Sequence, residues 1–172
     1  AALAAATDIS AQQQVFSGDD LTVSPYAINT RGLTEPQVGK KHEALAVIAE
    51  RAGDYQRAAR HYAVACGIQS QETRDFAMAS PICNSARTLA DQHGVVDARI
   101  RILVSAGVMR TWTFNFPAAV ATLKEAIALG KDLNPDDPDS APLVGAHQLL
   151  GSTLVEMSQF DEARTSLTFG RD

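Results

Sequence analysis

Large and small apolar residues alternate along this chain at helical spacing. Tyr55, Ala58, Tyr62 and Ala65 are three, four and three residues apart, which places all four on one face of a helix. The same spacing returns twice, at Phe116, Ala119, Leu123 and Ala126, and at Phe160, Ala163, Leu167 and Gly170. An alanine between two larger residues lets another helix approach closely, so the pattern predicts tightly packed helices.

A small residue precedes each copy of this spacing. Ala46, Gly107 and Gly151 each stand nine positions before the leading aromatic residue. A small residue on a first helix, opposite the alanine of a second, is what a closely packed antiparallel pair needs. The pattern therefore predicts three helix pairs of one design.

The recurring pattern resembles the tetratricopeptide repeat, a helix–turn–helix unit of about 34 residues. The resemblance covers residues 38–172, but it departs from the family in two ways. His42, Leu103 and His147 stand where a tryptophan usually opens a copy, and the leading aromatic residues are unevenly spaced, 61 and then 44 residues apart. The resemblance implies an all-α solenoid of antiparallel helix pairs, wound as a right-handed superhelix, with about seven to eight helices and an irregular N-terminal segment.

Two regions are expected in the chain. Residues 1–33 form an N-terminal extension that packs on the solenoid or caps it, with a helix over 1–17 and turn-forming residues over 18–33. Residues 34–172 form the repeat domain, in which Thr34 with Gln37, Asp54 and Asn115 start helices as caps. The predicted helix pairs are 35–67, 73–93 with a break at Pro81, 95–133, and 141–170, with a proline-rich loop over 134–142.

The stretch 73–93 is the least regular. Ser80 is a good cap and Pro81 a good first helical residue, whereas proline inside a helix costs about 3 kcal/mol. A break at Pro81 gives two short helices, 73–79 and 81–93, and a count of eight from residue 35. One long helix would give seven and put the later pairs out of phase with the first, so we predict the break.

Composition narrows the choice of partners. The chain is 45% hydrophobic with a formal net charge of -5, and it has no basic cluster, which argues against nucleic acid. No apolar run is long enough to span a membrane. The chain does not begin with methionine, and Ala1–Ala6 could be the end of a signal peptide or the first turn of a helix. Cytoplasmic and exported locations are therefore both possible. The last helix pair is not followed by a polar capping helix, so the array could self-associate through this end.

Two cysteines, Cys66 and Cys83, fall on expected core faces. In an exported protein they could pair and join the second helix to the third. Buried free thiols that act as small hydrophobes are the alternative, and we favour it here. The spacing matches no zinc motif.

An acidic stretch has a partial calcium pattern. Asp132, Asn134 and Asp136 match the first three ligand positions of a calcium loop. The match then fails, because Asp137 stands where glycine is needed and Leu143 where a bidentate glutamate belongs. We interpret the stretch as a solvated acidic turn and expect no metal.

No catalytic motif is present. The chain lacks GxSxG, HExxH and a glycine-rich phosphate loop, and none of its four histidines has a nucleophile at a telling spacing. His42 and His147 take equivalent places in their repeats and are expected to be packed, hydrogen-bonded rings. The sequence predicts neither an enzyme nor a cofactor.

The resemblance implies a binding surface instead, because the first helix of each pair in this family lines a concave groove for peptides or partner helices. The residues expected on that groove are Lys40, Glu43, Val47, Glu50, Arg51, Arg101, Val104, Val108, Trp112, Gln148, Ser152 and Val155. This mixed surface suits an anchored peptide, although we favour a core position for Trp112, at a helix corner beside Phe114 and Phe116. The lysine-and-asparagine clamp that some members use for a terminal carboxylate is not evident.

The leading functional hypothesis is a non-catalytic scaffold module that binds a protein or a peptide. One alternative is a ligand- or peptide-sensing domain of a bacterial signalling or transcription protein, whose longer repeats the stretches 89–94 and 128–133 resemble. Another is an exported envelope assembly factor, which a Cys66–Cys83 bridge would favour. Residues 1–33 could also occupy the groove in cis as an autoinhibitory segment.

Overall fold

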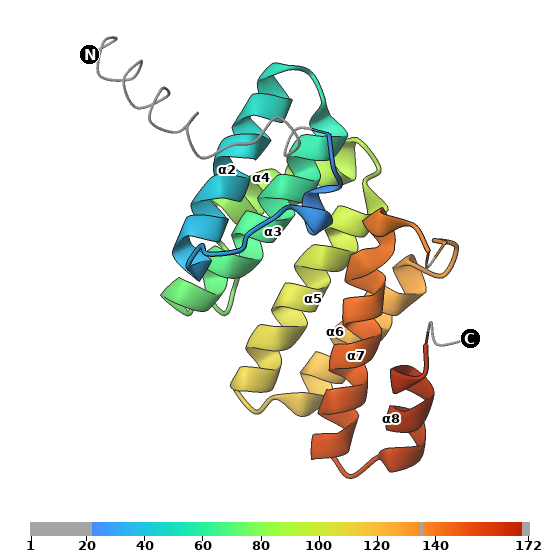
Figure 1. Ribbon diagram of the computed structural model, residues 1–172. Coiled ribbons are helices and arrows are strands. Elements are labelled where there is room, and N and C mark those ends of the chain that lie inside the picture. The colour runs from blue at the N-terminus through green and yellow to red at the C-terminus, as the bar shows by residue number, and fades with distance from the viewer. Residues whose placement is uncertain (1–21, 135, 170–172) are drawn as a thin grey trace.

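The computed structural model describes residues 22–134 and 136–169, and this part of the chain contains helices and loops but no strand (Figure 1). Its seven α-helices are α2 (Glu35–Arg51), α3 (Tyr55–Thr73), α4 (Pro81–Gln92), α5 (Val96–Trp112), α6 (Phe116–Leu129), α7 (Ala141–Glu156) and α8 (Phe160–Leu167). Two short 3-10 helices are η2 (Pro25–Ala27) and η3 (Pro138–Ser140). The all-α prediction is confirmed, whereas the helix expected over 1–17 and the small residue Gly170 lie outside the described residues.

The predicted caps are found at the helix starts. The side chains of Asp54 and Asn115 each accept the backbone N–H three residues further on, at 3.0 and 3.4 Å. Gln37 Oε1 accepts the backbone N–H of Thr34 at 2.8 Å, the reach-back of a capping box. These local bonds satisfy helix N–H groups that have no partner within the helix.

Helix α3 runs past the predicted end at Gly67 and continues to Thr73. Gly67 does not end the helix, because it lacks a left-handed conformation; it serves close packing instead, since a Cβ there would lie 2.4 Å from Oγ of Ser105 on α5. The helix ends instead where Arg74 takes a left-handed conformation, with φ 53°.

The predicted short helix over 73–79 does not form. In its place the Asp75 carboxylate accepts the backbone N–H groups of Ala79 and Ser80, at 2.7 and 3.1 Å, and holds a turn. Ser80 then caps α4, which begins at Pro81. The break at Pro81 is confirmed, but the count from residue 35 is seven helices in the described chain, not eight.

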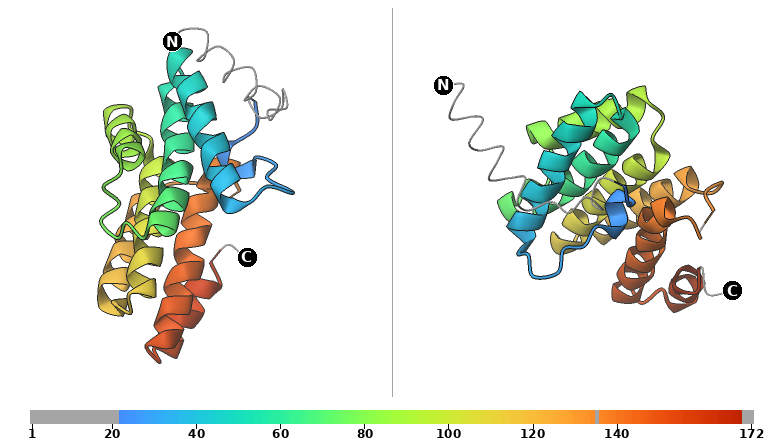
Figure 2. Two further views of the ribbon diagram at one scale, coloured as in Figure 1. Left: turned by 90° about the vertical axis from the view of Figure 1, so that its left-hand side faces the viewer. Right: turned by 45° about the horizontal axis from the view of Figure 1, so that its top comes forward.

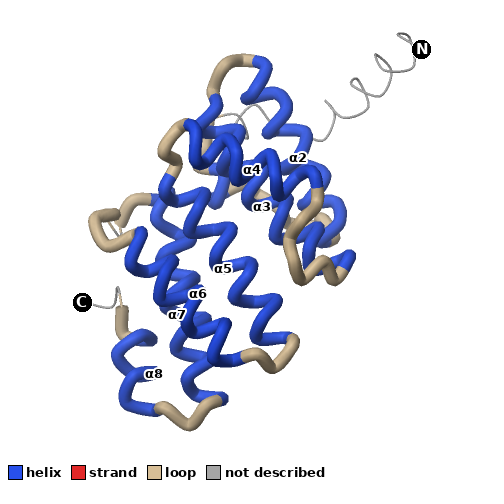
Figure 3. Tube along the Cα trace, turned by 180° about the vertical axis from the view of Figure 1, so that it is seen from behind, coloured by secondary structure: helices blue, strands red, loops and turns tan. Residues whose placement is uncertain are grey.

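The odd helix count decides how the helices are layered. Helices α3, α5 and α7 follow one another side by side, and α4 and α6 lie behind them (Figures 1 and 2). The segments between helices are loops at the helix ends (Figure 3). One helix, α4, stands where the sequence predicts two, and it packs on α3. As a result α3, the second helix of its predicted pair, shares a layer with α5 and α7, the first helices of theirs.

The small residues make the close contacts that the sequence predicts. A Cβ added to Gly107 would lie 2.8 Å from Leu123 Cδ2, and one added to Gly151 would lie 2.4 Å from Leu167 Cγ. Ala46 is fully buried in the same way between α2 and α3. These contacts bring the two helices of each pair together.

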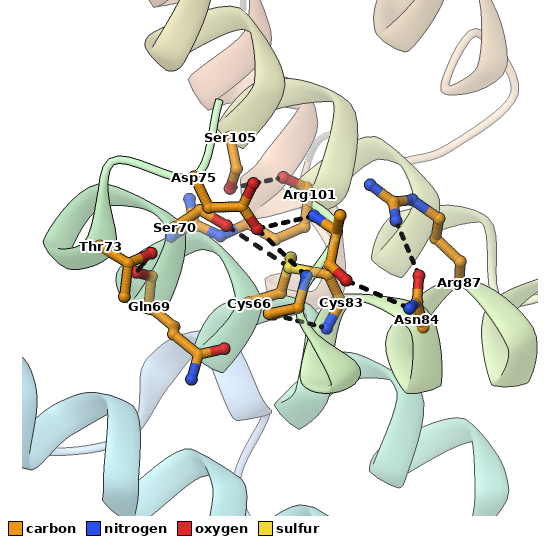
Figure 4. Close-up of a disulfide and its surroundings, with 12 residues drawn as sticks. Cys66, Gln69, Ser70, Thr73, Asp75, Cys83, Asn84, Arg87, Arg101 and Ser105 are labelled. Carbon is orange, nitrogen blue, oxygen red and sulfur yellow. Dashed lines mark hydrogen bonds between the residues drawn. A yellow bond between two sulfur atoms is a disulfide. The ribbon is translucent and has the colours of Figure 1, made fainter. Parts of the chain in front are cut away.

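A disulfide joins Cys66 of α3 to Cys83 of α4 (Figure 4). The two Cα atoms are 4.7 Å apart, and both side chains are buried in the core between these helices. The turn over 74–80 brings α4 back along α3, so that the two sulfur atoms meet. The preference for free thiols is therefore wrong, and the bridging alternative holds.

We expect Gly107→Ala to lower the free energy of unfolding by about 1–3 kcal/mol, because buried Leu123 has no room to move aside. The matched control is Gly145→Ala on α7, where an added Cβ meets no atom within 4 Å. That change should stabilise by about 0.5–1 kcal/mol through helix propensity. Urea unfolding followed by circular dichroism compares the two, and equal effects would contradict the close helix contact.

Removing the bridge with Cys66→Ala and Cys83→Ala should lower the free energy of unfolding by about 3 kcal/mol, because the bond closes a short loop with a sequence separation of 17. Denaturant unfolding with and without a reductant measures this. Reductant should bring the wild-type chain down to the double variant and leave the variant unchanged. A wild-type chain insensitive to reductant would show that the bridge contributes nothing.

Candidate functional site

A segment without α-helix crosses the front of the helices in Figure 1, and we call residues 22–34 the strap. It contains η2, which packs against α3 and against η3. Pro25 and Ile28 of the strap are buried, so the segment is seated on the helices. Helices α3 and α5 lie beneath it, with α2 and α7 on either side.

Two hydroxyl groups of the strap bind carboxylates on distant parts of the chain. The Tyr26 hydroxyl donates to Oδ2 of Asp97, at the start of α5, over 2.9 Å. Ser24 Oγ donates to Oδ1 of Asp139, in η3, over 2.7 Å. Hydrogen bonds to ionised acceptors are among the stronger ones, so these two contacts fix the position of the strap.

Side chains also bind the backbone of the strap. Lys41 Nζ donates to the carbonyl oxygen of Asn29 over 3.2 Å, and Arg57 Nη2 donates to the carbonyl oxygen of Val23. Lys41 belongs to α2 and Arg57 to α3. The helices therefore hold the strap through its main chain as well as its side chains.

Arg60 on α3 connects both acceptors. Its Nε lies 2.6 Å from Asp97 Oδ2 and its Nη2 lies 3.0 Å from Asp139 Oδ2. Asp97 is only 5% exposed and lies in the first turn of α5, where the helix dipole favours a negative charge. One guanidinium therefore ties α3 to α5 and η3, and through their carboxylates to the strap.

The electrostatics keep the strap's tyrosine in its donor form. Burial, together with the charge and hydrogen bond of Asp97, raises the pKa of Tyr26 well above its usual value. On the other side of α3, burial and the bond to Glu50 raise the pKa of Tyr62 to about 12. Both hydroxyls therefore stay protonated as hydrogen-bond donors at neutral pH.

A cavity of about 310 Å³ lies between the strap and the helices. Its lining residues come from the strap, α2, α3, α5 and α7: Pro25, Tyr26, Ile28, Thr30, Val38, His42, Val64, Ile68, Arg101, Ala141, Pro142 and Gly145. This set is mainly apolar and contains no aspartate or glutamate. Arg101 supplies its one guanidinium.

The structure does not gather the predicted groove residues on one surface. Helix α3 lies between α2 and α5, so the positions expected on α2 are separated from those expected on α5. On α2, Lys40, Glu43, Glu50 and Arg51 are exposed, and Val47 packs against the core. Glu50 accepts the Tyr62 hydroxyl at 2.9 Å.

The positions expected on α5 and α7 are also divided. Arg101 lines the cavity, whereas Val104 is buried in the core and Val108 is partly buried. On α7, Gln148, Ser152 and Val155 are exposed. Of the predicted groove set, Arg101 is thus the residue that lies at the strap.

The preferred core position for Trp112 is wrong. Trp112 is 54% exposed at the end of α5, and Phe114 in the following turn is 80% exposed. Phe160, at the start of α8, is 60% exposed, and Tyr55 is also exposed, although both were expected to fill helix contacts. These residues stand at helix ends, beyond the neighbouring helix that would cover them.

The expectation of packed, hydrogen-bonded histidine rings is confirmed for His42, whereas His147 is packed but its buried Nδ1 has no hydrogen-bond partner in the described part of the chain. His42 is buried, and its Nδ1 lies 3.1 Å from Nδ1 of His61 on α3. His147 stacks on Phe169 with ring centroids 3.7 Å apart, and burial lowers the pKa of His147.

Sequence reasoning missed Tyr26, Arg60, Asp97 and Asp139. Asp97 could have been found from the sequence, because it stands three positions before the apolar Ile100. This spacing places its carboxylate on the packing face of the helix, where an unpaired charge would be costly. Arg60 could not have been found in this way, since an arginine between alanine and histidine on a helix is ordinary.

Comparison of the chain with protein-family models, with curated protein sequences and with solved structures found no match. Among residues 22–134 and 136–169, no three or more His, Cys, Asp or Glu side chains gather as a metal site. No helix in that part of the chain is long and apolar enough to cross a membrane.

Asp97→Asn should lower the free energy of unfolding by about 2–4 kcal/mol, because Arg60 then keeps a half-buried charge without its closest carboxylate. Asp91→Asn is the control, since Asp91 pairs with Arg99 at the surface over 3.3 Å. That change should cost less than about 1 kcal/mol. Urea unfolding measures the free energy of unfolding of both variants. A similar decrease in the two would show that the buried ion pair stabilises the fold no more than the exposed one.

Proposed function

We propose that this chain is a non-catalytic module that binds a protein or peptide segment in the groove that the strap covers. The observation that carries the proposal is the strap itself. Its contacts are those that a peptide partner would make: carbonyl oxygens bound by Lys41 and Arg57, and two hydroxyls bound by carboxylates.

The helix array supports this proposal. Three helix pairs share the same sequence pattern, namely α2/α3, α5/α6 and α7/α8. Together with the close contacts at Gly107 and Gly151, they are consistent with a tetratricopeptide-like solenoid. Such an array offers a preorganised surface. On binding, most of the loss of conformational entropy therefore falls on the incoming segment, and the helices lose little.

In this proposal the strap competes with the partner. An intramolecular segment has a high effective concentration, so it reduces the apparent affinity for any partner that needs the same surface. The strap therefore acts as an autoinhibitory segment, and a partner must displace the contacts at Ser24 and Tyr26 to bind.

The disulfide favours an exported setting for this module. Bridges such as Cys66–Cys83 form and persist mainly in oxidising compartments. This supports the exported assembly factor as a second candidate, in which the same groove would receive a segment of an envelope protein.

The test uses a labelled peptide of residues 22–33 and a chain from which residues 1–33 are deleted, with binding followed by fluorescence anisotropy. We expect the peptide to bind the shortened chain and not the full chain, where the strap occupies the groove. A peptide with Tyr26→Ala should bind at least roughly tenfold more weakly, because it lacks the bond to Asp97.

A second route covers the case in which the shortened chain fails to fold. A protease site placed at Gly32, an exposed turn residue without close neighbours, allows the folded full chain to be cut and the strap to exchange. If the peptide does not bind to either preparation while circular dichroism shows folded helices, the groove is not a peptide site.

A further inference from the structure

The cavity beneath the strap differs in chemistry from the rest of the chain. The chain carries a formal net charge of -5, yet the residues that line the cavity in the described part of the chain supply one guanidinium and no carboxylate. Its walls are otherwise mainly apolar. Such a combination of apolar walls with one placed charge is typical of a small-molecule site.

Arg101 is the unusual group in this cavity. In the described part of the chain its Nε is enclosed and has no hydrogen-bond partner, and no carboxylate lies within ion-pair distance of it. Arg60, one helix away, contacts two carboxylates. Burial lowers the pKa of Arg101, which reflects the cost of enclosing the charge. A partly buried cation that has no counterion among the described residues costs free energy, which a bound anion would offset.

We propose that this cavity binds a small organic monocarboxylate, with the carboxylate on Arg101 and the apolar part of the ligand against Val38, Val64, Ile68 and Pro142. A guanidinium matches the planar carboxylate with two parallel hydrogen bonds. A single cation suits one negative charge better than the two of a phosphate monoester. The inference goes beyond the proposed function, because it concerns a free small molecule and not a polypeptide.

The strap makes a polypeptide a poor occupant of this cavity. Four strap residues, Pro25, Tyr26, Ile28 and Thr30, occupy one side of the cavity, whose volume is about 310 Å³. That space fits an acid with a short chain or a single ring.

Binding of the acid should stabilise the strap. Pro25, Tyr26, Ile28 and Thr30 form part of the lining, so a ligand in the cavity adds contacts that exist only when the strap is closed. By linkage, the ligand then shifts the chain toward the closed form. The small acid would thus regulate access to the groove.

The experiment uses the full chain at pH 7 with hexanoate and phenylacetate as probes, by isothermal titration calorimetry and thermal unfolding. We expect at least one acid to bind and raise Tm with concentration, and the matching carboxamide to do neither. Hydrogen exchange over residues 22–30 should slow when the acid is present. A short peptide with a C-terminal leucine carboxylate should bind at least tenfold more weakly than the acids, because the strap residues occupy the side of the cavity that its chain would need.

Arg101→Met separates a ligand-binding role from a structural one. We expect it to weaken acid binding at least tenfold while leaving Tm without ligand unchanged or higher, because an uncompensated charge has been removed. Arg110→Met, an exposed position on the same helix, should alter neither. Gly145→Leu keeps Arg101 but places a side chain at the cavity wall, where a Cβ meets no atom within 4 Å, and should also weaken binding.

Two results would overturn the proposal. One is that neither acid binds the wild-type chain, or that acid and carboxamide bind alike. The other is that Arg101→Met lowers Tm and leaves acid affinity unchanged, which would make Arg101 a structural residue. Binding of the 22–33 peptide to the shortened chain is read separately, so failure of either proposal leaves the other standing.

Discussion

The contact between Arg60 and its two carboxylates is the constraint on which the strap depends. It joins α3 to the first turn of α5 and to η3, segments that lie far apart in the sequence. The same carboxylates accept the hydroxyls of the strap, so one half-buried guanidinium sets the position of both acceptors. Because Asp97 is almost fully buried, its charge needs this partner, and the network holds together or is lost as a unit.

The single helix α4, which stands where two helices were predicted, has the largest effect on the surface. A repeat array with only complete pairs would place α2 in the layer of α5 and α7, and the first helices would form one continuous face. Here α3 takes that place, and α2 stands beside it as a wall. The groove is therefore floored by α3 and α5 and bounded by α2 and α7, which leaves room for a segment of the chain to lie in it.

Much of the helix layout could be predicted from the sequence, because caps and small-residue contacts are local signals. Asp54, Asn115 and Ser80 mark helix starts, and Gly107 marks a helix contact. The strap network could not be predicted, since it unites side chains that are 37 to 115 residues apart. Gly67 misled the prediction because a glycine that ends a helix and a glycine that admits a neighbouring helix look alike in a single sequence.

The disulfide also determines how this molecule would carry mechanical load. Cys66 and Cys83 close a covalent ring around the turn over 74–80, so a pull on the two ends of the chain passes from α3 to α4 through the sulfur atoms. The turn itself bears no tension. The segment between the two cysteines, with a sequence separation of 17, cannot be pulled out, so the chain extends by about 60 Å less than it would without the bridge. The irregular junction between α3 and α4 would then be among the mechanically strongest points of the described helices.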